Sequence, residues 1–318
     1  MRILVTGSAG HLGEALMRTL REGGQEAIGL DVLSSPYTDR IGSIVDRAFV
    51  AHAMRGVDAV LHAATLHKPH VATHPRQAFV DVNVTGTLNL LEEAVAAEVG
   101  AFVFTSTTSA FGDALAPAVD GPATWITEDV VPLPKNIYGL SKLAAEHLCE
   151  LMHRLHRLPC LVLRTSRFFP EDDDVPERRD AHDDANLKLN ELLYRRADIQ
   201  DIVDAHLLAI ARAPEIGFDR YVISATSPFT QDDLVALRTD PASVVARRVP
   251  GYVAQYTKRG WTMLDTVDRV YVNEKARGEL GWRPRHDFAG SIERLARDED
   301  FRSPLTHAIG AKGYHRTD

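Results

Sequence analysis

Short runs of aliphatic and β-branched residues alternate, along the first half of the chain, with longer segments in which apolar residues recur every three or four positions. The runs are typical of strands buried in a parallel sheet, and the periodic segments are typical of helices that cover it. The predicted strands are 3–5, 26–30, 40–45, 59–64, 101–104, 161–164 and 221–224. Because strands that alternate with helices favour right-handed crossovers, we predict an α/β fold with a doubly wound parallel sheet.

The helical periods place the longest helices at 76–99 and 138–156, and a further helix at 199–210. In the segment 138–156 the apolar period predicts a packing face formed by Leu143, Ala144, His147, Leu148, Leu151 and Met152. The proline-rich segment 113–135 is predicted to be a loop, because proline lacks a backbone N–H and is excluded from helix interiors and central strands.

Composition is that of an ordinary globular protein, with 45% hydrophobic and 25% charged residues. A net charge of -8 without a cluster of Lys and Arg argues against a nucleic-acid binder. We expect no signal peptide, because the first strand begins at residue 3, and no membrane span, because no apolar run is long enough. Cys149 and Cys160 are expected to be small buried hydrophobes rather than a disulfide. These observations predict a cytoplasmic protein.

A glycine-rich turn follows the first predicted strand and contains Gly7, Gly10 and Gly13. A pyrophosphate can approach the N–H groups of a helix N-terminus only where no Cβ intervenes. We therefore predict that Gly7 forms the turn, Gly10 admits the phosphates and Gly13 lets helix and strand pack. Asp31 ends the second strand, where a carboxylate accepts hydrogen bonds from an adenosine ribose. No Arg or Lys directly follows Asp31 to pair with a 2′-phosphate, which favours NAD over NADP.

Two further features place chemistry at the carboxyl ends of the strands. Five consecutive hydroxyl residues, 105–109, follow the strand 101–104, at the sheet edge where ligands bind in open α/β folds. Tyr138 and Lys142 are four residues apart at the start of a helix, so they lie on one face. An ammonium beside a phenol favours the phenolate, so Tyr138 can act as a base. A nearby hydroxyl such as Thr107 can hold the substrate oxygen.

In this order, these features resemble the motifs of the extended short-chain dehydrogenase/reductase family, the NAD-dependent epimerase/dehydratase group. Residues 6–13 are similar to its T-G-x-x-G-x-x-G motif, and residues 83–91 to its N-x-x-G-T-x-N-L-L helix. Residues 106–112 resemble its hydroxyl motif, which ends in an aromatic residue and glycine, and Tyr138 to Lys142 resembles its Y-x-x-x-K pair. The resemblance covers residues 1 to about 165, with looser matches further along.

The resemblance implies Tyr138 as the catalytic acid and base, Lys142 as its activator and a ligand of the nicotinamide ribose, and Thr107 as the partner of the substrate oxygen. It also implies hydride transfer between NAD and a secondary alcohol of a sugar or nucleotide sugar, and a homodimer formed through the helices 76–99 and 138–156. The expected cofactor-binding residues are Gly7, Ala9, Gly10, His11, Leu12, Gly13, Asp31, Ala63, Ala64, Asn83, Thr105, Tyr138 and Lys142.

The chain length of 318 residues suggests two lobes. We predict that residues 1–165, rejoined by about 196–225, form an NAD-binding Rossmann domain. Residues 166–195 and 226–318 are expected to form a smaller C-terminal lobe that binds a small-molecule substrate.

The reaction and the substrate are less constrained by the sequence. Where dehydratases of the family carry an acidic pair, this chain has Thr108-Ser109, which disfavours dehydration. Tyr194 stands where sugar-nucleotide epimerases often place a phosphate-binding arginine, and Thr108, Arg167 and Arg196 are candidate substrate-binding residues. An epimerase is favoured. A net NAD-dependent dehydrogenase would use the same catalytic groups, and a non-catalytic NAD sensor is a minor third alternative.

Two polar loops carry further titratable residues. The loop 66–74 contains His67, His70 and His74, but no carboxylate or cysteine completes a metal site, so a cleft-lining or solvated loop is favoured over a metal site. The acidic run 171–174 is expected to be a solvated loop, with a mobile rim over the substrate as the alternative.

Overall fold

The computed structural model describes residues 1–168 and 183–312, and the chain forms two compact units. The first unit consists of Met1–Gly112, Pro132–Thr165 and Val203–Tyr221, and the second of Asp113–Val131, Ser166–Ile202 and Val222–Asp318. The acidic run 171–174, predicted to be a loop, lies outside the described residues.

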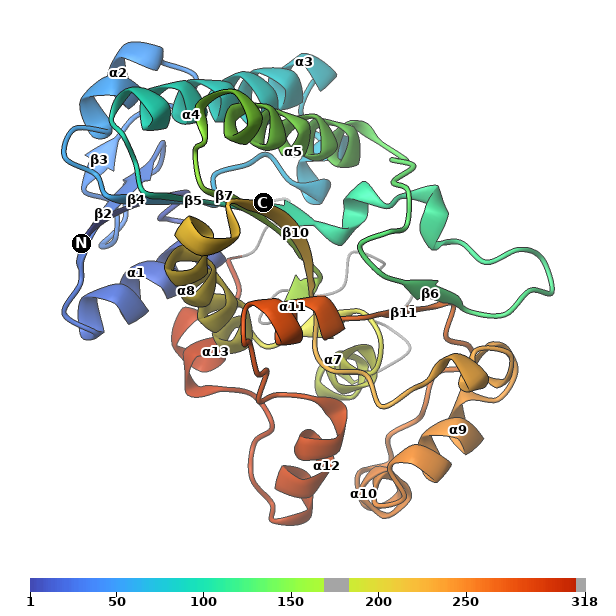
Figure 1. Cartoon of the computed structure of the whole chain (residues 1–318). Helices are drawn as coiled ribbons and strands as arrows, with labels where there is room; N and C mark the ends of the chain where they lie inside the picture. The colour runs from blue at the N-terminus through green and yellow to red at the C-terminus, as the bar shows by residue number, and fades with distance from the viewer. Residues whose placement is uncertain (169–182, 313–318) are drawn as a thin grey trace. The chain divides into compact units, whose positions relative to one another are not determined.

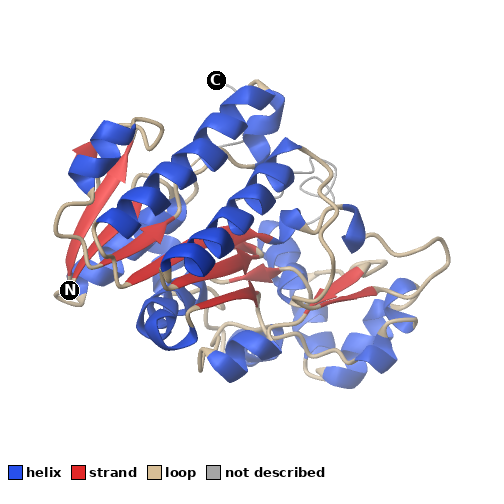
Figure 2. Ribbon diagram, turned by 45° about the horizontal axis from the view of Figure 1, so that its top comes forward, coloured by secondary structure: helices blue, strands red, loops and turns tan. Residues whose placement is uncertain are grey.

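A seven-stranded parallel sheet forms the centre of the first unit (Figure 2). Its strands are β1 (Arg2–Thr6), β2 (Glu26–Asp31), β3 (Arg40–Ile41), β4 (Ala59–His62), β5 (Ala101–Thr107), β7 (Cys160–Thr165) and β10 (Phe218–Ile223). Their order is β10-β7-β5-β4-β1-β2-β3, so the direction of winding reverses between β1 and β4. The predicted α/β fold with a doubly wound parallel sheet is confirmed. In such sheets ligands bind beyond the carboxyl ends of the strands at the point of reversal.

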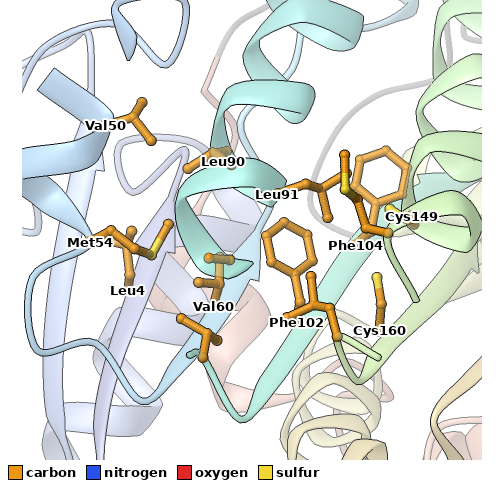
Figure 3. Close-up of a cluster of buried hydrophobic side chains, with 14 of the residues drawn as sticks. Leu4, Val50, Met54, Val60, Leu90, Leu91, Phe102, Phe104, Cys149 and Cys160 are labelled. Atoms are coloured by element: carbon orange, nitrogen blue, oxygen red, sulfur yellow. The ribbon is translucent and has the colours of Figure 1, made fainter. Parts of the chain in front are cut away.

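Helices cover both faces of this sheet (Figure 1). On one face lie α2 (Arg47–Ala53), α4 (Gly86–Ala96) and α5 (Ile137–His156), and on the other lie α1 (His11–Glu22) and the later part of α8 (Ile199–Ile216). Beneath α4 and α5 a continuous apolar core includes Phe102 and Phe104 of β5 (Figure 3). Cys149 and Cys160 lie in this core as free thiols, as predicted.

The helix predicted at 76–99 is interrupted by a change of helical type. α3 (Arg76–Phe79) continues into a π-helical turn, η2 (Val80–Thr85), before α4 begins at Gly86. Because a π-helical turn spaces its hydrogen bonds one residue further apart, it rotates the side chains that follow. A prediction from one constant period does not anticipate this rotation.

Two other segments differ from the predicted pattern. The strand predicted at 40–45 ends at Ile41, because a turn in which the Asp46 N–H donates to the Ser43 carbonyl leads into α2. The predicted loop 113–135 contains η4 (Asp113–Leu115) and a strand, β6 (Thr124–Ile126). This strand pairs with β11 (Arg269–Tyr271), and a partner so distant in sequence is not visible in a local pattern.

The buried face of α5 is not the one that its apolar period predicts. Of the predicted packing residues only Met152 is buried; His147 is exposed, and the remaining four are partly buried. The buried positions are instead Tyr138, Gly139, Ser141, Lys142, Ala145, Glu146, Cys149 and Met152. The prediction was wrong because this face carries polar side chains whose partners lie on other elements.

The second unit is built from short elements around an aromatic core. They are β6, β8 (Arg167–Phe168), α7 (Asp184–Leu192), β9 (Arg196–Ala197), α9 (Pro241–Arg248), α10 (Tyr252–Arg259), β11, α11 (Glu274–Glu279), α12 (Phe288–Ala296) and α13 (Pro304–Ile309). In its core Tyr252 and Tyr256 meet edge to face, with ring centroids 5.0 Å apart. Within the described ranges, no helix has the length and apolar character needed to cross a membrane.

Candidate active site

The turn between β1 and α1 leaves no room for a side chain at two of its glycines. Gly7 has a φ of +76°, and a Cβ there would lie 2.7 Å from the backbone nitrogen of Ala64. A Cβ on Gly13 would lie 1.9 Å from the Gly7 carbonyl oxygen, so helix and strand pack backbone against backbone. This geometry fits the predicted roles of Gly7 in the turn and Gly13 in packing.

The N-terminus of α1 has the form of an anion site. Gly10 is its N-cap residue, in an extended conformation and without a side-chain cap, and His11 and Leu12 begin the helix. Helix N-termini present backbone N–H groups and the positive end of the dipole. Because neither a Cβ at Gly10 nor a capping side chain fills this position, the pyrophosphate of NAD fits here.

Asp31, at the end of β2, is held against the glycine-rich turn. Its carboxylate accepts hydrogen bonds from the backbone N–H of Ala9 at 3.0 Å and from that of Leu33 at 2.9 Å. Each carboxylate oxygen keeps a second lone pair, which suits the hydroxyls of an adenosine ribose. Among the residues that the structure describes, Asp31 makes no ion pair, so a 2′-phosphate would meet an uncompensated negative charge.

A fully buried histidine, His62, ends β4 just before the predicted cofactor residues Ala63 and Ala64. Its Nδ1 lies 2.7 Å from the Thr6 hydroxyl and its Nε2 lies 2.9 Å from the Thr87 hydroxyl. The Thr87 hydroxyl donates to a backbone carbonyl at 2.7 Å, so it must accept from His62 Nε2–H. His62 therefore carries a proton on Nε2. Burial, and then the charge of Lys142, lowers the pKa of His62 well below its ordinary value.

Asn83, in the π-helical turn, joins the loop after β4 to the start of α5. Its side-chain oxygen accepts from the Leu66 N–H at 2.8 Å and the Thr65 hydroxyl at 2.9 Å. Its amide nitrogen donates to the Leu66 carbonyl and to the Ser141 hydroxyl, both at 2.9 Å. The Ser141 hydroxyl in turn donates to the Tyr138 carbonyl at 3.0 Å. All of these hydrogen bonds of the Asn83 amide are made to protein groups. Asn83 would therefore affect cofactor binding indirectly, by fixing the position of the loop after β4.

The hydroxyl segment at the end of β5 is divided between the two faces of the sheet. The Thr105 hydroxyl lies 2.8 Å from Nε2 of His206 on α8, so it is engaged on that face. Thr107 is 8% exposed, and its hydroxyl oxygen accepts from the Ser109 N–H at 3.1 Å. The Thr107 proton thus remains able to donate to a substrate oxygen. Thr108, a candidate substrate contact, is buried at the start of η3 (Thr108–Ala110).

Tyr138 and Lys142 lie on one face of α5, as their spacing predicts, and this face is buried. The helix begins where Asn136 accepts from the Gly139 N–H at 3.0 Å. Tyr138 is 8% exposed and Lys142 is 2% exposed. The Lys142 ammonium lies 4.0 Å from the ring centroid of Phe104, on β5. The aromatic face holds the cation where water does not reach it.

Burial lowers the pKa of Lys142 from 10.5 to about 7, while the neighbouring Cys149 and Glu146 act in the opposite direction. A negative charge placed beside a buried lysine raises the pKa of that lysine strongly. Ionisation of Tyr138 would favour the Lys142 ammonium, and the ammonium would favour the phenolate by the same coupling. Lys142 can thus release or take up a proton near neutral pH.

The candidate substrate residues Arg167 and Arg196 meet at one buried carboxylate in the second unit. Glu191 accepts from Arg196 Nε at 2.6 Å and pairs with Arg167 Nη1 at 3.2 Å, and Arg195 also contacts it. Arg196 has no exposed surface and donates to the Phe168 carbonyl at 3.1 Å. The Arg167 side chain is 20% exposed. Of the two, Arg167 therefore has surface that a ligand can reach.

The histidine-containing loop forms a short helix, η1 (Lys68–Ala72), in which neighbouring imidazoles meet edge to face. The His67 and His70 ring centroids are 4.5 Å apart, and those of His70 and His74 are 5.0 Å apart. Burial, and then the proximity of His74, lowers the pKa of His70. In the part of the chain described, no group of three or more His, Cys, Asp or Glu side chains is arranged to hold a metal ion.

A cavity of about 670 Å³ in the second unit contains none of the predicted site residues. It is lined by residues between 239 and 265, including Tyr252 and Tyr256. Their hydroxyls donate to the Ala242 carbonyl at 3.1 Å and to the Asn190 side-chain oxygen at 2.7 Å. These polar groups are thus bound within the protein rather than aimed at a ligand.

Four residues around the predicted groups were missed by sequence reasoning: His62, Phe104, Ser141 and Glu146. A signal was present for two of them. His62 interrupts an otherwise apolar strand, and Glu146 continues the four-residue spacing of the Tyr–Lys pair. A polar residue inside a buried pattern needs a partner, which makes it a candidate for a functional contact.

Known proteins are similar to this chain along most of its length. The sequence model of the NAD dependent epimerase/dehydratase family matches residues 3–223. A dTDP-glucose 4,6-dehydratase of Streptomyces antibioticus is 30% identical, over 92% of this chain and 91% of its own length. A UDP-glucose 4-epimerase of Streptomyces lividans is 28% identical, over 91% of this chain and 93% of its own length. A solved short-chain dehydrogenase/reductase superfamily protein of Agrobacterium tumefaciens with bound NAD has a TM-score of 0.66 at 25% identity, over 93% and 96%. The chain therefore belongs to the NAD-dependent epimerase/dehydratase family, as its motifs implied, and its cofactor is NAD.

Proposed function

We propose that this protein is an epimerase that acts on a nucleotide sugar. The observation that carries the proposal is the buried Tyr138–Lys142 pair on α5, together with a Thr107 hydroxyl whose proton can be donated. When bound, NAD accepts a hydride from the substrate carbon and returns it. The protein's part is to move the accompanying proton and to orient the substrate oxygen.

In this proposal Tyr138, as the phenolate, takes the proton of a substrate hydroxyl while the hydride leaves the same carbon. Lys142 stabilises the phenolate as its counter-charge. Thr107 donates its hydroxyl proton to the substrate oxygen and keeps that oxygen beside Tyr138. When the ketone is reduced on its opposite face, Tyr138 returns the proton to the oxygen. The substrate therefore undergoes no net oxidation.

Dehydration is disfavoured by the residues that follow Thr107. A dehydratase needs an acid to protonate the leaving hydroxyl and a base to remove a proton from the adjacent carbon. This chain has Thr108 and Ser109 there, and neither hydroxyl ionises near neutral pH. A dTDP-glucose 4,6-dehydratase is nevertheless among the similar proteins, so the 4-keto-6-deoxy product must be sought in the test.

The nucleotide-sugar class is supported by two observations. The similar proteins include enzymes named for dTDP-glucose and UDP-glucose. In addition, the Arg167 side chain is 20% exposed, and the donors of a guanidinium suit phosphate oxygens. We propose Arg167 for the anionic part of the substrate, while Arg196 supports it through the shared carboxylate of Glu191.

The test is incubation of the purified protein with NAD and with UDP-glucose, UDP-galactose or dTDP-glucose. Chromatography of the products and absorbance of NADH are followed together. An epimer without accumulated NADH is expected. Accumulated NADH would indicate a net dehydrogenase, and a 4-keto-6-deoxy product would indicate a dehydratase. NAD binding without any product would favour the sensor alternative.

The matched variants are Tyr138→Phe and Tyr252→Phe, each of which removes one phenolic hydroxyl. Tyr138→Phe is expected to bind NAD normally and to lose at least about a hundredfold in kcat, because general acid–base catalysis is removed. Tyr252→Phe should keep its activity, because the Tyr252 hydroxyl only donates to the Ala242 carbonyl. Full activity of Tyr138→Phe would refute the proposed role.

A further inference from the structure

A third polar residue continues the Tyr138–Lys142 face of α5. Glu146 follows Lys142 by four residues, so the three side chains lie one turn apart on one side of the helix. The Glu146 side chain is completely buried. A carboxylate is rarely buried without charged or hydrogen-bonding partners, and those of Glu146 come from three strands.

Glu146 binds a hydroxyl on β5 and a guanidinium on β7. The Ser106 hydroxyl donates to Oε1 at 2.5 Å. Arg164 donates through Nε at 3.2 Å to both oxygens and through Nη2 at 2.8 Å to Oε2. Arg220, on β10, forms a longer ion pair with Oε2 at 3.4 Å. Both carboxylate oxygens are thus occupied by charge-assisted bonds that join the helix to the sheet.

These contacts lie directly beside the candidate catalytic hydroxyl. Ser106 precedes Thr107 in the chain, and the two pair in register with Arg164 and Thr165 of β7. The Thr165 hydroxyl donates to the Ser106 carbonyl at 3.0 Å. The end of β5 is therefore held from two sides, by the neighbouring strand and by the helix that carries Tyr138 and Lys142.

A buried ion pair seldom stabilises a fold more than apolar residues of the same volume would. Its contribution is geometric, because a carboxylate that accepts several hydrogen bonds restricts the positions of its partners. We propose that Glu146 is a positioning residue, which holds the Thr107 end of β5 in register with the Tyr138–Lys142 face. The proposal rests on the proposed function in that it assigns Thr107 and Tyr138 to one reaction.

The same carboxylate sets the charge around Lys142. Among the described residues, Cys149 and Glu146 on its own helix and His62 from β4 interact electrostatically with Lys142, and the Phe104 ring from β5 contacts its ammonium. Removal of the negative charge of Glu146 should therefore make the Lys142 ammonium less stable. This gives the proposal a consequence that can be measured without any substrate.

The experiment compares Glu146→Gln with Glu146→Gln/Arg164→Met and with Ser106→Ala. The double variant removes both charges, so that no buried guanidinium is left uncompensated. The matched control is Glu150→Gln, one turn further along α5, which removes a carboxylate paired with Arg220 at 2.6 Å. Each protein is examined for thermal unfolding, NAD affinity, kcat and KM, and for the pKa of Lys142. The last is measured by NMR of ε-13C-labelled lysine, with Lys142→Met identifying the signal.

We expect Glu146→Gln to lower the pKa of Lys142 and to reduce kcat at least about tenfold at similar KM and NAD affinity, because the reacting groups are misaligned. The double variant should recover the thermal stability of the wild type, but its Lys142 pKa and its kcat should remain below the wild-type values. Ser106→Ala should lose less activity, and Glu150→Gln should resemble the wild type.

A double variant with wild-type kcat and a wild-type Lys142 pKa would overturn the proposal, because Glu146 would then serve stability alone. If the wild type turns over no nucleotide sugar, the proposed function fails separately. The Lys142 titration and crystal structures of wild type and Glu146→Gln then decide, since an unchanged pKa and an unchanged spacing of the Thr107 and Tyr138 hydroxyls would overturn the inference.

Discussion

Replacing Lys142 by methionine should make the protein more stable at pH 7, although it removes a proposed catalytic group. Burial lowers the pKa of Lys142 from 10.5 to about 7. At about 1.4 kcal/mol for each unit, this lysine destabilises the folded state at pH 7 by about 4–5 kcal/mol. The variant also loses the contact of the ammonium with the Phe104 ring, which is worth about 2 kcal/mol. The net gain in the free energy of unfolding is therefore about 2–3 kcal/mol.

The gain should shrink as the pH rises. Between the folded and unfolded pKa values the unfolded chain binds more protons than the folded protein, so the wild-type free energy of unfolding increases with pH in this window. Between pH 7 and pH 9, the free energy of unfolding of the wild type should rise by about 2 kcal/mol relative to that of Lys142→Met. Urea unfolding without NAD, followed by circular dichroism at both pH values, measures the difference.

Lys258→Met is the matched control, because the Lys258 side chain is 55% exposed and pairs with Asp298 at the surface. It should show no comparable change in stability between the two pH values. The reasoning is refuted if Lys142→Met is less stable than the wild type at pH 7. It is equally refuted if the difference between them does not change with pH, because the lysine would then titrate as it does in the unfolded chain.

Three further predictions concern the cofactor, the pH dependence of stability and the assembly. Gly13→Ala should abolish NAD binding in a fluorescence titration, because its Cβ would lie 1.9 Å from a backbone oxygen, whereas Gly278→Ala, with no atom within 4 Å of its Cβ, should bind normally. Burial raises the pKa of Asp201 from 3.8 to about 6, so the acid is easier to protonate in the folded state. The free energy of unfolding should fall by about 2–3 kcal/mol as the pH rises through this window, and Asp201→Asn should lose that dependence in urea unfolding. If the homodimer that the family resemblance implies forms through the helices 76–99 and 138–156, Leu140→Arg, at a side chain that is 54% exposed, should yield a monomer in light scattering, and an unchanged mass would argue against this interface.

The fold and the cofactor turn could be predicted because their signals are local. The turn at Gly7, the acidic end of β2 and the Tyr138–Lys142 spacing each depend on a few consecutive residues. Local geometry leaves little choice at these positions, since Gly7 adopts a φ of +76° and a Cβ on Gly13 would enter the backbone. Short apolar runs likewise suffice to predict strands buried on both faces.

The rest of the site could not be predicted because it depends on pairing between distant segments. His62 is bound to Thr6, 56 residues earlier, and Glu146 to Ser106, 40 residues earlier. The apolar period of α5 favoured the wrong face for the same reason. Polar residues lie on the surface unless they find hydrogen-bonding partners in the interior. Glu146 of α5 finds such a partner in Arg164, which lies on the strand β7.

Phe104 lies close to both a buried histidine and a buried lysine. Its ring centroid lies 5.4 Å from that of His62 and 4.0 Å from the Lys142 ammonium. A protonated His62 would repel Lys142 and compete for the same aromatic face. Burial, and then the charge of Lys142, lowers the pKa of His62 and so keeps it neutral. The burial of His62 therefore favours the proton on Lys142 rather than on His62, which is where the proposed reaction needs it.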